Sequence, residues 1–378
     1  MPLEIVSQGV IYRNPYPGYR AVTAVMGQIL PLTSSHWLCA FRQGSAFFSD
    51  DGMIHIARSR DMGASWEHEG PVHRLGSHEK GYNYTSPELS IRADGAILLA
   101  AFRVDQSDPQ KLFVNAETGG LLPIENIFFV SMDEGCTWSR PQPITLPAEW
   151  PTPVVGAPNG PIIELDDGRW FFGLETWKAY DDTGPPDFRS LGLFSDDGGD
   201  TWGALTTIAD GRGRNRAYSH GRFTKRLDGR LFAMLWTGTA DMSASFELHA
   251  VVSDVTGRQW SGPRPTGLPG QTNWAVDLGD GRMAAIYTRR DSEQPGLVAV
   301  ISEDDGMTWN TEEQVMVWDA YGKEALGVPR TDRYPSSHDA IAYGKPHAAR
   351  LSCDEFVTTF WCTQGADTHV RYCQLKVV

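Results

Sequence analysis

The sequence lacks the features that mark membrane and exported proteins. Nowhere do about 18 apolar residues follow one another, and the N-terminus has no basic segment followed by an apolar one. We therefore expect no membrane-spanning helix. With no signal segment visible we expect a cytoplasmic protein, although a secreted chain already trimmed of its signal peptide would look the same.

Motifs for several kinds of chemistry are also missing. The chain has no glycine-rich phosphate loop, no serine nucleophile elbow and no pair of histidines at helical metal-binding spacing. The cysteines are odd in number and without close pairs, which argues against a zinc site. They are Cys39, Cys136, Cys353, Cys362 and Cys373. We expect reduced packing residues, no metal and no other cofactor.

Basic residues are fewer than acidic ones, 33 against 47, so the net charge is −14. The field of such a chain repels nucleic acid and anionic membrane surfaces, so we expect neither as a partner. A local basic pocket can still bind an anion. The 378 residues, 41% of them hydrophobic, supply ample core and suggest two domains or one array of repeats.

Five segments share one pattern: Ser, then Asp two residues on, Gly at the fourth step and Trp at the seventh. They begin at Ser59, Ser131, Ser195, Ser302 and, with Val255 in place of the Asp, at Ser253. In a tight hairpin turn the carboxylate can accept backbone N–H groups, the Gly can take a positive φ, and the Trp can pack between sheets. The pattern predicts structure rather than chemistry, because a calcium loop needs a denser set of oxygen ligands.

The turns recur at roughly sixty residues, the length of a four-stranded blade with long loops. Apolar runs joined by Asp-Gly precede most of them, at residues 94–95, 167–168, 228–229 and 280–281. Helical periodicity is absent. We predict that residues 1–378 form a single all-β domain, a six-bladed β-propeller. The strand at residues 3–12 is expected to close the ring, and the ligand site to lie opposite the repeated turns.

These turns resemble the Asp-box, or BNR, repeats of the sialidase (neuraminidase) superfamily, and the resemblance covers essentially the whole chain. It implies an exo-acting glycoside hydrolase on an acidic, sialic-acid-like or uronic-acid-containing sugar. Arg20, in Pro-Gly-Tyr-Arg-Ala-Val, stands where the family begins a triad of arginines that clamps the sugar carboxylate. The resemblance implies Arg42 and either Arg289 or Arg290 as further members and Asp51, preferred over Asp50, as the acid/base.

The open ends of inner strands surround the channel of a propeller. We expect the substrate-binding side chains there, and they are Arg20, Arg42, Glu88, Arg103, Asn159, Arg222, Asn273, Trp274, Arg289, Lys345 and His347. Converging guanidinium groups suit a carboxylate, sulfate or phosphate, although each arginine alone could equally pair with a local acid. Trp236, Trp274 and Trp361 could stack on a sugar or pack between blades.

The candidate catalytic residues are Asp51, Glu175 and His220. Glycoside hydrolysis usually needs two carboxyl groups, and Asp51, Glu88 and Glu175 are available. Glu175 ends an apolar strand, where burial would raise its pKa and suit a general acid; a salt bridge to Lys178 is the alternative. His220 could act as a base or bind a sugar hydroxyl.

Two other functions fit the same residues. His220 as base beside a carboxylate-binding arginine would suit a lyase that acts on uronic acids. A glycan-binding propeller without catalysis is the second alternative. In each case the expected partner is an anionic small molecule or oligosaccharide, and an oligomer would leave no trace in the sequence.

Overall fold

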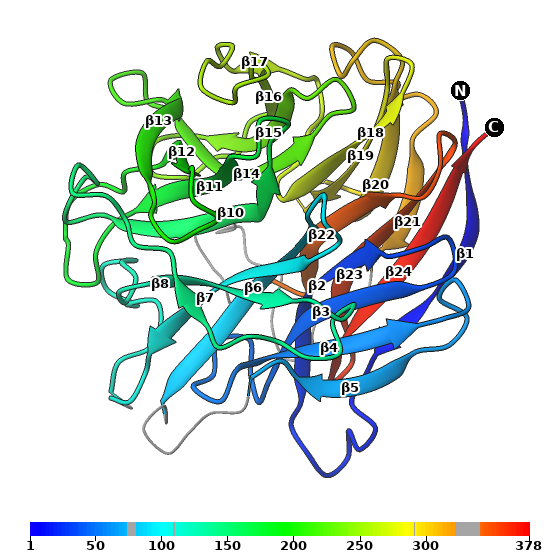
Figure 1. Ribbon diagram of the computed structural model, residues 1–378, viewed down its shortest axis with the longest axis horizontal. Helices are drawn as coiled ribbons and strands as arrows, with labels where there is room; N and C mark the ends of the chain where they lie inside the picture. The colour runs from blue at the N-terminus through cyan, green and yellow to red at the C-terminus, as the bar shows by residue number, and fades with distance from the viewer. Residues whose placement is uncertain (74–80, 109, 291, 322–340) are drawn as a thin grey trace.

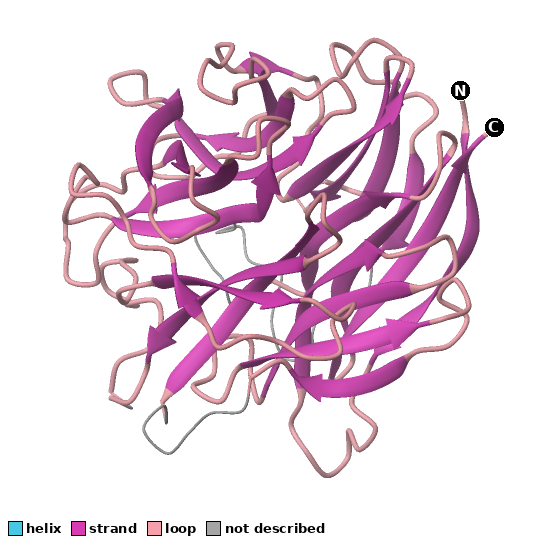
Figure 2. Cartoon of the chain, in the orientation of Figure 1, coloured by secondary structure: helices cyan, strands magenta, loops and turns pink. Residues whose placement is uncertain are grey.

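The fold is built from strands alone. The computed structural model describes residues 1–73, 81–108, 110–290, 292–321 and 341–378, and every regular element within them is a β-strand (Figure 2). None of these residues forms a helix that could cross a membrane. The all-β prediction is therefore confirmed.

Four sheets contain four antiparallel strands each, in sequence order. The first has β6 (Tyr82–Ile91), β7 (Ile97–Asp105), β8 (Glu125–Ser131) and β9 (Gln142–Pro143). The second has β10 (Val155–Glu164), β11 (Trp170–Trp177), β12 (Arg189–Ser195) and β13 (Gly203–Asp210). The third has β14 (Ala217–Lys225), β15 (Leu231–Gly238), β16 (His249–Val252) and β17 (Arg264–Pro265). The fourth has β18 (Asn273–Gly279), β19 (Arg282–Arg289), β20 (Gly296–Ser302) and β21 (Val315–Asp319).

The remaining strands form one eight-stranded sheet. Its order is β22 (Tyr343–Arg350), β23 (Glu355–Gln364), β24 (Asp367–Val377), β2 (Thr23–Pro31), β3 (Trp37–Gly44), β4 (Met53–Ser59) and β5 (Glu67–Pro71), with β1 (Leu3–Tyr12) paired to β24. A parallel pair, Thr23 with Thr368, joins β2 to β24.

The predicted six-bladed ring is wrong for the strands that the structure describes. They pair as four separate four-stranded blades and one larger sheet, because the bridge at Thr23 merges the N-terminal and C-terminal strands. β1 runs antiparallel along β24 from Leu3 to Tyr12. It extends the large sheet instead of closing a ring of six separate blades.

The sheets surround a common centre, and the first strand of each four-stranded sheet lies innermost (Figure 1). The inner strands β2, β6, β10, β14, β18 and β22 contact one another in this order, and β22 contacts β2. Hydrophobic clusters fill the spaces between neighbouring sheets. One of them joins Phe128 of β8 to Trp170, Phe172 and Trp202 of the second sheet. Apolar burial between sheets therefore holds the propeller together.

The repeated turns have the hydrogen bonds that their residues predict. In the second turn, Asp133 Oδ1 accepts the N–H of Thr137 at 2.8 Å and Oδ2 accepts its hydroxyl at 2.6 Å. The turns at Ser59, Ser195 and Ser302 repeat this arrangement within 0.1 Å. In the degenerate turn, Asp254 replaces the missing Asp and accepts the N–H groups of Arg258 and Gln259.

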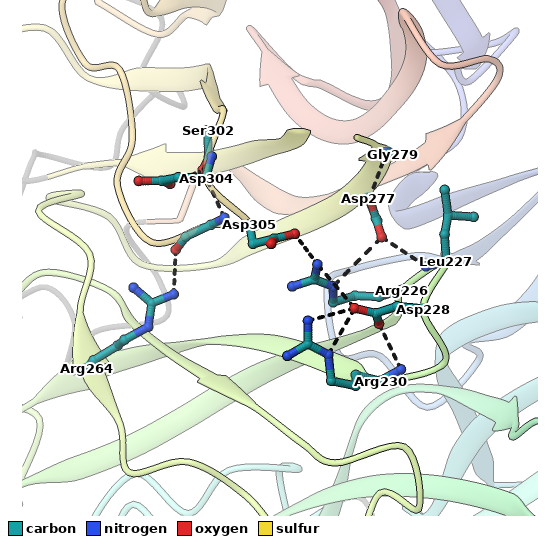
Figure 3. A network of polar contacts seen from close by, with 11 residues as sticks. Arg226, Leu227, Asp228, Arg230, Arg264, Asp277, Gly279, Ser302, Asp304 and Asp305 are labelled. Carbon is teal, nitrogen blue, oxygen red and sulfur yellow. Dashed lines mark hydrogen bonds and ion pairs between the residues drawn. The ribbon is translucent and has the colours of Figure 1, made fainter. Parts of the chain in front are cut away.

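A buried arginine ties the third sheet to the fourth at the end where the repeated turns lie (Figure 3). Arg226, only 6% exposed, forms ion pairs with Asp305 and Asp228 and lies 3.8 Å from Asp277. Asp277 is also buried, and it accepts the N–H of Leu227 at 2.9 Å. One guanidinium therefore neutralises carboxylates of two sheets.

Candidate functional site

Five inner strands carry an irregularity at the same place in their sheets. In each of them, the register of pairing with the following strand shifts at a bulge. The bulges lie within residues 25–28, 85–88, 158–162, 219–222 and 344–347. The described residues of β18 pair without a shift from Asn273 to Asp277. Such bulges re-aim side chains, and they are common next to binding sites.

Residues of these bulges have a left-handed backbone. Met26, Ser86, His220 and Lys345 have φ angles of 59°, 55°, 50° and 42°. A non-glycine residue in this region costs about 1–2 kcal/mol, which the surrounding structure must offset. All four side chains line one central cavity of about 370 Å³. The strained backbone of the inner strands therefore turns its side chains toward a shared space.

The cavity lies at the end of the sheets opposite the repeated turns. Its other lining residues come from segments that follow second strands, such as Phe48 after β3 and Trp236 at the end of β15. In antiparallel sheets these connections lie at the opposite end from the turns between third and fourth strands. The predicted face is therefore the one that holds the cavity.

Glu175, Ser219 and His220 form a hydrogen-bonded group at the cavity. Ser219 Oγ lies 2.7 Å from Glu175 Oε2 and 2.6 Å from His220 Nδ1. A carboxylate only accepts, so the single serine proton goes to Glu175, and Nδ1–H donates to Ser219 Oγ. Nε2 then carries the free lone pair, and it has no hydrogen-bond partner within the described part of the chain. A neutral His220 therefore has its proton-accepting atom unpaired among these residues, and the His220 side chain lines the cavity.

Glu175 is held as an anion, which corrects the expectation of a raised pKa. Burial raises its pKa, but the charge that His220 carries when protonated and the hydrogen bonds from Ser219 and the His220 backbone outweigh burial and lower it. The His220 N–H donates to Oε2 at 2.5 Å. Glu175 therefore contacts both the ring and the backbone of His220 as an anion, and its lowered pKa does not favour the general-acid role expected from the sequence. Its expected salt bridge to Lys178 does not form, since Lys178 Nζ donates to the carbonyl of Gly184.

A second polar group joins two cations to one carboxylate. Glu88, which is 1% exposed, lies 2.8 Å from Lys345 Nζ and 3.2 Å from Arg222 Nη1. Lys345 also donates to Ser86 Oγ at 2.8 Å. Burial lowers the pKa of Lys345 to about 8, the charge of Arg222 adds to this, and Glu88 opposes it. Lys345 and Arg222 line the cavity, and these two cations share the one carboxylate of Glu88.

Four other predicted residues are buried, and none of them lines the cavity. His347 contacts Gln28 at 3.1 Å and packs edge-on against Trp274, with ring centroids 4.3 Å apart. Burial and the nearby charges of Lys345 and Arg222 hold the pKa of His347 well below its ordinary value, so it is neutral. Asn159 and Asn273 are at most 1% exposed.

Asp51 is not brought to the cavity. It lies in an exposed loop, where its carboxylate accepts the backbone N–H and the hydroxyl of Ser45. Arg42 is fully buried beneath the same loop, and its guanidinium donates to Asn83 and to the carbonyls of Ala46 and Ser49. Both residues therefore organise the loop that follows β3.

Three further arginines lie away from the cavity. Arg20 is exposed, with its guanidinium over the ring of Tyr16. Arg103 pairs with Glu125 at 2.7 Å, and Arg289 donates to the carbonyl of Gln294 at 3.1 Å. The structure thus assembles Glu175, His220, Arg222 and Lys345 with Glu88 beneath them, but not an arginine triad made of Arg20, Arg42 and Arg289.

Ser86 and Ser219 were missed by the sequence reasoning. The available signal was a Gly or Pro in the middle of inner strands, as in Ser86-Pro87, His220-Gly221 and Lys345-Pro346, since such residues mark bulges. Among the described residues no group of His, Cys, Asp and Glu could hold a metal ion.

Comparison with known proteins supports the fold. Solved structures that resemble the chain include a protein of unknown function from Dyadobacter fermentans, with a TM-score of 0.74, 18% identity and 100% coverage of both chains. A Hadza microbial sialidase has a TM-score of 0.67 at 14% identity, over 98% of this chain and 68% of that one. An α-L-arabinanase from Penicillium chrysogenum, complexed with arabinobiose, has a TM-score of 0.67 at 14% identity, over 99% and 98%. At these identities the likeness shows the fold alone.

Sequence comparison gives the family. No curated protein matches the chain. The model of the BNR repeat-like domain matches residues 87–324, which is more than half of the sequence and includes four of the repeated turns. The chain therefore belongs to the BNR repeat-like domain family.

Proposed function

We propose that this protein is a carbohydrate-active enzyme, a glycosidase that binds an anionic saccharide in the central cavity. The observation that carries the proposal is the pairing of two groups in one space: the Glu175–Ser219–His220 group, and two cations that share the single carboxylate of Glu88. Solved structures with the same fold include a sialidase and an arabinanase complexed with arabinobiose, which is consistent with a sugar ligand.

Each polar group has a distinct task in this proposal. Lys345 and Arg222 bind the anionic group of the sugar, because a buried cation with incomplete neutralisation favours an added negative charge. In hydrolysis the protonated His220 gives its Nε2 proton to the leaving oxygen, and Glu175 orients the ring and stabilises the imidazolium. Asp241 also lines the cavity, and hydrogen bonds from Thr239 and Ser243 lower its pKa to about 2. Its carboxylate is the second group that hydrolysis requires.

Elimination from a uronic acid is the second candidate, and the free Nε2 of His220 favours it. A neutral imidazole held by a carboxylate can remove the proton beside the sugar carboxylate, whose negative charge Lys345 and Arg222 stabilise. His220 takes the proton of the C–H bond, the C–O bond breaks as the C=C bond forms, and the imidazolium gives that proton to the leaving oxygen, so water is not consumed. The two reactions therefore give different products from the same cavity.

The test is to incubate the purified chain with sialosides, uronic-acid oligosaccharides and arabino-oligosaccharides, following released sugar and ultraviolet absorbance together. Released sugar without absorbance supports the glycosidase. Absorbance of an unsaturated product supports elimination and overturns hydrolysis. Binding by calorimetry without either product means a non-catalytic glycan-binding protein, and loss of turnover in His220→Gln assigns the chemistry to this cavity.

A further inference from the structure

Part of the cavity lining is a run of aromatic rings. The rings of Trp361, Phe47, Phe48, Phe113 and Phe102 follow one another with centroid separations of 5.2, 4.6, 4.8 and 5.9 Å. All five line the cavity. They come from β23, from the loop after β3, from the segment after β7 and from β7 itself. We call these five residues the aromatic wall.

Two tryptophans also line the cavity, and their indole N–H groups donate to other atoms of the protein. Trp177 packs edge-on against Phe188 at 4.6 Å, and its Nε1 donates to the carbonyl of Gly119. The ring centroids of Trp236 and His220 are 5.4 Å apart, and Trp236 Nε1 donates to Ser245 Oγ. These indoles therefore offer no N–H group to a sugar hydroxyl.

The cavity lining thus combines two kinds of chemistry. Ser86, His220, Arg222 and Lys345 lie at the bulges, and the aromatic wall stands on other segments. A sugar hydroxyl set against phenylalanine rings loses its hydrogen bonds to water and gains none, which weakens binding. One ring can stack on a sugar face, but a continuous run of rings favours an apolar group of similar extent.

We propose that the ligand of this cavity is an anionic glycoside whose second group is aromatic or otherwise apolar. The anionic part binds at Lys345 and Arg222, and the apolar part packs against the aromatic wall. The sugar part of this inference rests on the proposed function, whereas the amphipathic character of the ligand rests on the cavity alone. The proposed aglycone is therefore an apolar group and not a second hydroxylated sugar.

The experiment compares three probes that share a carboxylate. The affinities of 3-phenylpropanoate, propanoate and D-glucuronate for the full chain are measured by isothermal titration calorimetry at neutral pH. We expect the phenyl group to strengthen binding over propanoate by at least about tenfold, because burial of a ring removes apolar area from water. Equal affinities for the two propanoates would overturn the inference.

Two variants locate the effect. Phe48→Ser removes a half-buried ring of the aromatic wall and should remove most of the preference for the phenyl probe. Phe246→Ser is the matched control, because Phe246 is also half-buried but lies beneath Arg216, outside the cavity lining. A preference unchanged by Phe48→Ser contradicts the placement. The comparison between probes in the unaltered chain holds whether or not a variant folds.

The two proposals fail in different ways. If the chain releases sugar from glycosides but binds both propanoates equally, the aromatic wall has no ligand role and the proposed function stands. If the phenyl probe binds tightly but no saccharide is bound or cleaved, the amphipathic ligand stands and the glycosidase is lost. Once a cleaved sugar is known, its 2-phenylethyl glycoside should be cleaved with a higher kcat/KM than its disaccharide.

Discussion

The carboxylate of Glu175 binds His220 at two places, because Oε1 lies 3.4 Å from Nδ1 and Oε2 accepts the backbone N–H at 2.5 Å. The second contact depends on the backbone of His220, whose φ of 50° directs the N–H back toward β11. A single acid thus fixes both the backbone and the ring of the residue to which we assign proton transfer.

Replacement of Glu175 by Gln should therefore lower kcat by about 100-fold with little change in KM, because the amide no longer stabilises an imidazolium. The measurement is steady-state kinetics on whichever saccharide the panel identifies. His220→Gln combined with Glu175→Gln should be no worse than His220→Gln alone, since the two residues act as a unit. Losses that multiply in the double variant would contradict that coupling.

Lys345 predicts a pH dependence of anion binding. Burial lowers its pKa to about 8, so the ammonium is charged below this pH and neutral above it. Affinity for D-glucuronate should be full near pH 6.5 and fall by about tenfold as the pH rises through 8, because a charge-assisted hydrogen bond is lost. Calorimetry at several pH values measures this.

The control for Lys345 is another lysine. Lys345→Met should give weak binding that is flat across the same pH range. Lys111→Met removes an exposed lysine outside the cavity and should keep the full dependence. A slope that survives in Lys345→Met would assign the titration to a different group.

Local patterns in the sequence predicted the hairpins and the turns well. The Asp-Gly pairs at residues 94–95 and 167–168 do join first and second strands, and the Asp of each repeated turn accepts the expected N–H groups. These features depend on residues a few positions apart. The sheet count depends instead on one pairing between Thr23 and Thr368, which no local pattern encodes.

The sequence also predicted only those parts of the site that depend on local patterns. Glu175, His220, Arg222 and Lys345 were found because they stand near the open ends of strands. Asp51 was placed by resemblance, but its partner is Ser45 in its own loop. The aromatic wall was not found, because residues as distant in sequence as Phe47 and Trp361 meet only in the folded chain.

Arg226 should contribute more to stability than its neighbour Arg230. Arg226→Met leaves the buried carboxylate of Asp277 without its nearby cation, and the free energy of unfolding should fall by about 3 kcal/mol. Arg230→Met breaks a 2.7 Å pair with Asp228 in which both side chains are about 40% exposed, and it should cost less than about 1 kcal/mol. Urea denaturation of both variants checks the difference, and equal losses would contradict it.

The turn glycines allow backbone strain to be separated from packing between sheets. Gly198 and Gly199 have φ angles of 73° and 95°, so alanine is strained at both. A Cβ on Gly198 would meet nothing within 4 Å, whereas on Gly199 it would lie 2.8 Å from Phe128 Cζ and from Trp170 Cζ3. Gly198→Ala should therefore cost about 1 kcal/mol and Gly199→Ala about 3 kcal/mol. Phe128 belongs to the neighbouring sheet, so the difference between the two costs measures how closely this turn packs against that sheet. The Tm values of the two variants check this. Equal shifts in Tm would mean that the sheets move apart without a cost in free energy.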